Sequence, residues 1–261
     1  EAQTIAINKG RRQAWVTLIH RLTPSQDWAK VPALDDVGIQ RLIRTYGIAN
    51  ERRSTTRYVA EVTYVFNADA VRRFFRGANI AYTDVQARPI LVLPMGQAYA
   101  PRSPWAAAWN DPKFAQAAVP IVTPSGDAAE GVTLSTLQFA SAGWSDVEPT
   151  ATRTHTAQAV LAQALPARDR ITVKLRILGP NLSQALPDIN VPIAAGAPPA
   201  TAFGDAADAA ADAISNAWKS RSAVDFSARA KLAVDVKISS IADWGEVQWK
   251  MSVIPTILDV T

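Results

Sequence analysis

Apolar and polar residues alternate most regularly at residues 57–66, where every second position is apolar. This spacing is typical of a strand with one buried face. Three apolar residues at i, i+3 and i+4 follow, between Asn67, which can cap a helix start, and Gly77, which can end a helix. A continuous apolar run at residues 90–93 predicts a strand that is buried on both faces. Residues 57–95 therefore predict a strand, a short helix and a second strand.

Two earlier segments have the spacing of helices that bury one side. Residues 4–23 place apolar side chains at i, i+3, i+4 and i+7. Asp35 and Asp36 favour a helix start, and the same apolar spacing continues as far as Tyr46. We therefore predict two helices before the first strand, joined to it by a charged connector at residues 49–56.

Short strands and helices alternate in the second half of the chain. Residues 158–165 and 171–178 flank a Pro-Ala-Arg-Asp turn, and alternation in the second arm predicts a hairpin with one buried face. Ser145 begins a capping-box pattern, which marks a helix start. The other predicted elements are strands at residues 119–122, 189–193, 231–238 and 257–260, and helices at 134–142, at 201–219 and from Ser240 or Asp243 onward.

These elements predict an α+β protein with two successive small α/β modules. Pro94 and Pro101 interrupt the pattern, so we place the division near residues 96–117. We expect one module at residues 1–100 and another at 101–261. Each would be a mixed or antiparallel sheet with helices packed on one face, and the second would end in a strand, a helix and a strand.

Composition places the chain in an ordinary globular class and removes several chemistries. Hydrophobic residues make up 48% of the 261 residues and charged residues 19%, which allows a sizeable core. No apolar run approaches the roughly 20 residues that cross a bilayer, so we predict no transmembrane segment. Because cysteine is absent, the chain forms no disulfide, zinc-thiolate site, iron–sulfur cluster or cysteine nucleophile.

Positive charge is concentrated in the first hundred residues. They hold 14 lysines and arginines against 8 acidic residues, a net charge of +6, whereas residues 101–261 hold 13 against 15, a net charge of −2. Twelve of the 14 cations are arginine, which binds carboxylates and phosphates well. The pattern indicates a face for an anionic lipid, polymer or partner protein, and the alternative is that the arginines simply solvate helix faces. The candidate partner-binding residues are Arg41, Arg44, Arg72, Arg73 and Arg76.

Signatures of catalysis are absent from the sequence. The two histidines, His20 and His155, lie in different halves, and neither has a second ligand at metal-binding spacing. No nucleophile elbow, Ser-x-x-Lys motif, Walker loop or Gly-x-Gly-x-x-Gly motif occurs. Residues 123–127 fit a turn better than a phosphate loop, since no lysine follows them. We predict no enzyme, no metal site and no cofactor.

The arginines beside Phe74 and Phe75 also resemble a basic-aromatic patch for nucleic acid. The two phenylalanines have the spacing of core residues, however, so they would not be available to stack on bases. The order of elements fits no nucleic-acid module either, and we expect no nucleic-acid partner.

Several segments resemble an uncharacterised bacterial envelope family, domain of unknown function 2066. Residues 10–22 are similar to its first helix, and residues 58–66 and 88–92 are similar to its next section. Residues 236–244 and 253–260 resemble its closing strand, helix and strand. The layout is more distantly similar to α/β modules in flagellar assembly protein T and in the amino-terminal part of TolB. Members usually carry a secretory signal and a strand ahead of the first helix, and neither occurs here.

The resemblance implies an exported, periplasmic protein of a family without an established activity. Together with the arginine-rich first half, it leads to the hypothesis of a non-catalytic binding or scaffold module for another envelope component. The alternative is a carrier of an apolar small molecule such as a lipid or hopanoid, because eight tryptophans could line a cavity as well as fill a core. An enzyme is the third hypothesis, and it would need a cleft of converging carboxylates that the sequence does not pair.

Overall fold

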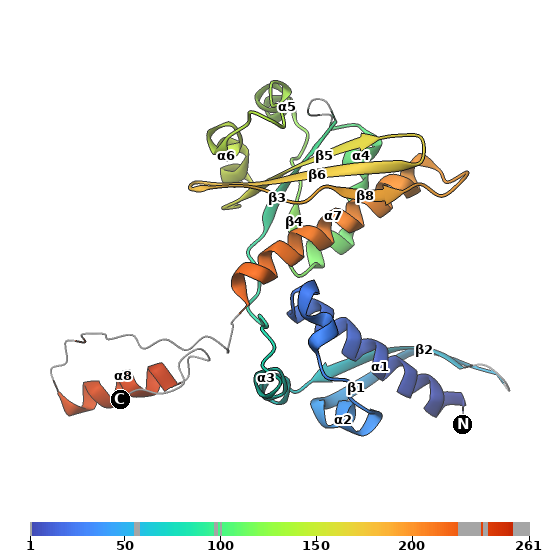
Figure 1. The fold of residues 1–261 in the computed structure, drawn as a ribbon, viewed down its shortest axis with the longest axis vertical. Helices are drawn as coiled ribbons and strands as arrows, with labels where there is room; N and C mark the ends of the chain where they lie inside the picture. Colours follow the sequence, from blue (N-terminus) through green and yellow to red (C-terminus); the bar gives the residue numbers. More distant parts are fainter. Residues whose placement is uncertain are drawn as a thin grey trace. The chain divides into compact units, whose positions relative to one another are not determined.

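The computed structural model describes residues 2–54, 58–96, 99, 101–223, 236 and 240–252. The chain divides into two compact units, each of which is described by itself (Figure 1). The first unit contains residues 1–83 and 222–261, and the second unit contains residues 84–221.

Helices pack beside a small antiparallel sheet in the first unit. The sheet pairs β1 (Ile43–Arg53) with β2 (Tyr58–Phe66), so that Tyr46 lies opposite Tyr64. The predicted alternation is confirmed, because side chains from Tyr58 to Tyr64 are alternately half-buried and exposed. The helices are α1 (Ala2–Leu22), the 3₁₀ helix η1 (Ser25–Lys30), α2 (Asp36–Leu42), α3 (Ala68–Gly77) and α8 (Ile241–Ser252).

Trp15 of α1 lies at the centre of an aromatic core in the first unit. It is 3% exposed, and its ring lies 6.0, 5.3 and 6.0 Å from the ring centroids of Phe66, Phe74 and Phe75. The apolar stripes predicted for α1 and α3 meet in this cluster. Asn67 caps α3 as predicted, because its side-chain oxygen accepts a hydrogen bond of 3.1 Å from the amide three residues later.

The strand β1 corrects the prediction for the residues that follow α2. The helix that begins at Asp36 ends at Leu42 instead of continuing to Tyr46, and the described part of the predicted connector lies mostly in β1. The amide of Asn67 donates to the carbonyl of Leu42 at 2.7 Å, which fixes the start of β1 beside the end of β2. Pairing with a strand distant in sequence therefore outweighs the local helical spacing.

A six-stranded mixed sheet forms the centre of the second unit. Its strand order is β4-β3-β5-β6-β7, and β8 also pairs with β6. β3 runs parallel to β4 and β5, and the other pairs are antiparallel. The strands are β3 (Ile90–Met95), β4 (Ile121–Val122), β5 (Ala159–Pro166), β6 (Arg170–Gly179), β7 (Leu182–Ala185) and β8 (Ile189–Pro192).

Helices cover both faces of this sheet (Figure 1). One core lies under α4, η2 and α7, and the other lies under α5 and α6. The helices are α4 (Pro104–Ala108), the 3₁₀ helix η2 (Pro112–Gln116), α5 (Ala128–Ser135), α6 (Trp144–Arg153) and α7 (Pro199–Ser222). The α+β class is confirmed, with one antiparallel and one mixed sheet, whereas the larger sheet has helices on both faces instead of the single face expected.

The strand β3 belongs to a different sheet from the one expected. All six of its residues are buried, which confirms a strand that is covered on both faces. It lies between β4 and β5 in the second unit, while the sequence placed it in a first module with β2. The second unit consequently begins at residue 84, before the expected boundary at residue 100. Apart from Val236, the strands predicted at 231–238 and 257–260 lie outside the described residues.

Other parts of the second unit follow the sequence more closely. The hairpin of β5 and β6 and the long helix α7 are confirmed. The helix expected at residues 134–142 lies earlier, at α5, because Asp127 caps its start through a 2.8 Å hydrogen bond from the amide of Glu130. Residues 136–143 form a loop between α5 and α6, which we call the α5–α6 loop. The strand β7 was not predicted, because its short and largely exposed sequence has little hydrophobic pattern.

Candidate functional site

The five arginines predicted to bind a partner lie on three elements of the first unit. Arg41 is in the last turn of α2, Arg44 is in β1, and Arg72, Arg73 and Arg76 are in α3. All are exposed except Arg72, which is half-buried. We call these five residues the arginine surface.

A single junction connects the three elements. The hydrogen bond from the amide of Asn67 to the carbonyl of Leu42 holds the end of α2 against the start of α3. Arg41 and Arg44 flank Leu42 in the sequence, so they belong to this junction. Arg76 lies at the far end of α3 and extends the surface away from it.

Acidic residues near the arginine surface already have cationic partners. Arg12 donates two hydrogen bonds of 2.6 Å to the carboxylate of Asp36, and these bonds lower the pKa of Asp36 and raise the pKa of Arg12. Within α3, Asp69 pairs with Arg72 at 3.1 Å. These two carboxylates therefore do not offset the charge of the exposed arginines.

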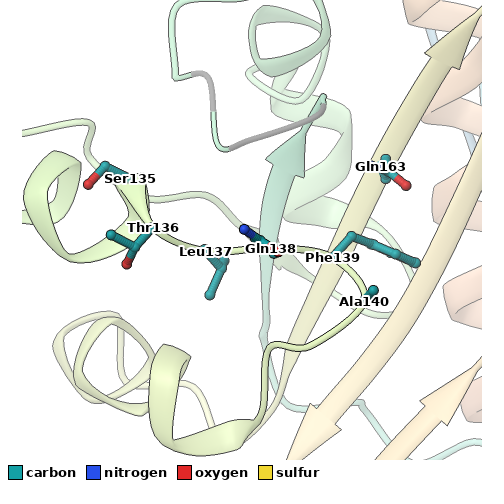
Figure 2. A pocket seen from close by; sticks show the side chains of 7 residues that line it. All are labelled: Ser135, Thr136, Leu137, Gln138, Phe139, Ala140 and Gln163. Carbon is teal, nitrogen blue, oxygen red and sulfur yellow. The ribbon is translucent and has the colours of Figure 1, made fainter.

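A second candidate site, which sequence reasoning missed, is a hollow of about 340 Å³ in the second unit. It lies where the α5–α6 loop passes β5, and Figure 2 shows its lining side chains. They are Ser135, Thr136, Leu137, Gln138, Phe139, Ala140 and Gln163. None is charged, and four carry a hydroxyl or a carboxamide. We call this site the loop hollow.

The guanidinium of Arg176 holds the loop in place. Arg176 extends from β6 and donates to the carbonyls of Phe139 at 2.5 Å, Ala140 at 2.7 Å and Ala142. Alternation along the hairpin had placed Arg176 on the polar face of β6. That face carries the loop at this point, because Arg176 lies opposite Leu161, which packs under α5 and α6. The signal that could have found this contact is a cation at the end of a strand otherwise buried on both faces.

The loop hollow lies at the carboxyl end of two parallel strands. Gln163 of β5 is paired with Met95, the last residue of β3, and its carboxamide donates to the carbonyl of Gly96 at 2.8 Å. A second hollow of about 350 Å³ shares Thr136, Leu137 and Gln138 with the first. The same short segment of chain therefore contributes to both hollows.

The turn at residues 123–127 is confirmed as a turn. Gly126 has a φ of 75°, a left-handed conformation that glycine adopts readily. The carboxylate of Glu130, which is 3% exposed, accepts hydrogen bonds of 2.9 Å from the Gly126 amide and from the Ser125 hydroxyl. A carboxylate of the chain itself thus takes the place that a phosphate would occupy in a phosphate loop.

The two histidines lie in different units. His20 stacks on Trp28 with ring centroids 3.6 Å apart, and His155 follows α6 with a φ of 54°. Among the described residues, no group of three or more His, Cys, Asp or Glu residues could hold a metal ion. In the same part of the chain, no helix combines the length and the apolar character needed to cross a membrane.

Comparison with known proteins assigns no family to this chain. No protein-family model matches it, and a search of curated proteins finds no match. The resemblance to the envelope family and the binding role of the arginine surface therefore stay predictions.

Proposed function

We propose that this protein is a non-catalytic binding or scaffold module of the bacterial envelope, which holds an anionic envelope component or the acidic face of an envelope protein. The arginine surface carries the proposal. Four of its guanidinium groups are exposed, while the carboxylates of Asp36 and Asp69 are paired with Arg12 and Arg72. Guanidinium groups bind phosphates and carboxylates through paired, charge-assisted hydrogen bonds. A periplasmic location is part of the same proposal.

The alternative of an apolar carrier has no observation in its favour. Trp15, Trp105 and Trp109 are each 3% exposed and contact other aromatic rings inside the cores. The two hollows found in the described part of the chain are lined largely by polar side chains. A carrier would bury a ligand of lipid size in a mostly apolar cavity.

Cosedimentation with vesicles tests the proposal. The protein should bind vesicles that contain phosphatidylglycerol better than vesicles of phosphatidylcholine alone, and binding should weaken as salt screens the charges. Replacing the four exposed arginines of the arginine surface by glutamine should weaken binding roughly tenfold or more, because each basic residue near such a surface adds about 1 kcal/mol. Polyglutamate serves as the probe for an acidic protein face.

A control variant with the same loss of charge separates the arginine surface from general attraction. Its substitutions are R88Q, R102Q, R168Q and R170Q, all at exposed positions of the second unit. This variant should keep most of the binding. Equal losses in the two variants, or no binding of either probe by the unaltered protein, would show that the proposal is wrong. Turnover of envelope lipids or glycans by the purified protein would contradict its non-catalytic part.

A further inference from the structure

We propose that the loop hollow is a binding site for a small neutral saccharide. The site lies in the second unit, whereas the proposed envelope-binding role rests on the arginine surface in the first. The inference is therefore independent of the proposed function, and either can fail without the other.

The size and the hydrogen-bonding groups of the loop hollow fit a mono- or disaccharide. Its volume of about 340 Å³ falls at the lower end of the range of ligand pockets, about 300–1,000 Å³. The side chains of Thr136 and Gln138 make no hydrogen bond within the described part of the chain, so their groups are available to a ligand. Ser135 donates its hydroxyl to the carbonyl of Val132 at 2.8 Å and keeps its acceptor lone pairs.

The lining offers apolar surface as well as polar groups. Phe139 is half-buried and lines the hollow together with Leu137, and Figure 2 shows its ring beside β5. A sugar ring presents hydroxyls along its rim and C–H groups on its faces. An aromatic ring can cover such a face while carboxamides and hydroxyls bind the rim.

The absence of charge in the lining of the loop hollow selects an uncharged ligand. None of the seven lining residues is ionisable as a side chain. The nearby guanidinium of Arg176 is engaged with the carbonyls of Phe139, Ala140 and Ala142. A phosphate or carboxylate placed in the hollow would lose hydration without gaining an opposite charge. Neutral saccharides avoid this cost.

The support of the loop hollow is fixed before a ligand arrives. Arg176 ties the α5–α6 loop to β6, and Gln163 is tied to the end of β3 by its bond to Gly96. A preformed site loses less conformational entropy on binding. The hollow also lies at the carboxyl ends of β3 and β5, the edge at which parallel strands in open α/β sheets commonly present ligand sites.

An NMR titration of the whole chain with N-acetylglucosamine tests the inference. We expect saturable shifts in the backbone amides of Gln138 and Phe139 and in the side-chain amide of Gln163. Glucuronic acid, an anionic sugar, should produce no saturable shifts there. The variant Gln138→Ala should bind about fivefold more weakly, the effect of one lost hydrogen bond. Gln184→Ala, at an exposed glutamine of β7, is the matched control and should leave affinity unchanged.

Each outcome decides for or against the loop hollow. Because Gln138 is exposed, its variant should give an otherwise unaltered spectrum, which separates loss of binding from loss of folding. Tighter binding of diacetylchitobiose than of the monosaccharide would identify a glycan chain as the source of the sugar, and equal binding a free sugar; both support the site. Absence of saturable shifts with either sugar, equal shifts with glucuronic acid, or shifts confined to other residues would overturn it.

Discussion

The exposed arginines of the first unit and the engaged Arg176 of the second unit represent two uses of one side chain. Residues 1–83 hold 13 lysines and arginines against 7 acidic residues, a net charge of +6, whereas residues 84–221 hold 10 against 11, a net charge of −1. In the second unit, Arg176 bonds to three carbonyls of a loop. Charge composition thus identifies the unit with surplus charge, and the neighbours of each arginine determine its role.

The cores of the two units differ in the same sense. The first unit depends on a few large aromatic side chains around Trp15. The second unit distributes its burial over two faces of a sheet, and the alanines of α7 allow that helix to pack closely on one of them. A single substitution should therefore cost the first unit more than a comparable loss at the edge of the second.

The largest expected effect is that of Trp15→Ala. The change removes the ring shared by Phe66, Phe74 and Phe75, so the free energy of unfolding should fall by about 3–5 kcal/mol. Urea denaturation followed by circular dichroism measures this loss. Trp249→Ala is the control, because Trp249 is 65% exposed and its loss should cost little. A loss for Trp15→Ala no larger than that of the control would contradict the central place of Trp15.

Arg176→Met should have the next largest effect. The substitution keeps an extended side chain but leaves the carbonyls of Phe139, Ala140 and Ala142 without their donor, which should cost about 2–3 kcal/mol. Hydrogen exchange in the α5–α6 loop should become faster while exchange in α7 stays unchanged. Arg170→Met, at an exposed position of the same strand, should leave both unaltered. Unchanged exchange in the loop of the Arg176 variant would refute its role in holding the loop.

Tyr64→Phe should weaken the contact between α1 and β2 by a smaller amount. The Tyr64 hydroxyl donates to the carbonyl of Ile7 at 2.6 Å, and its loss should cost about 1 kcal/mol. Burial raises the pKa of Tyr64, so its contribution to stability is present below the ordinary pKa of 10.0 and is lost as the pH rises through the folded-state pKa. Denaturation at rising alkaline pH should show this loss in the unaltered protein and less of it in the variant. Tyr46→Phe, at an exposed tyrosine, should retain the alkaline loss.

The smallest effect is expected for Asp36→Asn. The hydrogen bond from Arg12 lowers the pKa of Asp36, so the pair stabilises the fold above the unfolded-state pKa, and this contribution is lost as the pH falls through the folded-state pKa. Both groups are exposed, so the effect should be small and sensitive to salt. Urea midpoints of the variant and the unaltered protein should differ slightly at neutral pH and converge in strong acid. A difference that persists in acid would exclude the ion pair as its cause.

Local patterns were sufficient for elements that show their environment in their own sequence. The alternation of β2, the cap of α3 and the hairpin of β5 and β6 are of this kind. They failed for β1, whose helical spacing is overridden by pairing with β2, and for the sheet to which β3 belongs. Strand partners distant in sequence leave no local signal.

The two candidate sites differ in the same way. The arginine surface could be predicted because its charge is a property of composition and of exposed helix positions. The loop hollow could not, since it depends on Arg176 and Gln163 meeting a loop more than twenty residues away in the sequence. Its lining residues are uncharged and match no motif, so their only signal is spatial.

Hydrogen exchange of the whole chain, with and without phosphatidylglycerol vesicles, tests the central claim most directly. The account predicts slower exchange in α2, in the start of β1 and in α3, where the arginine surface lies, and unchanged exchange in the strands of the second unit. Slower exchange confined to residues 84–221, or no protection at vesicle concentrations that bind the protein, would contradict it.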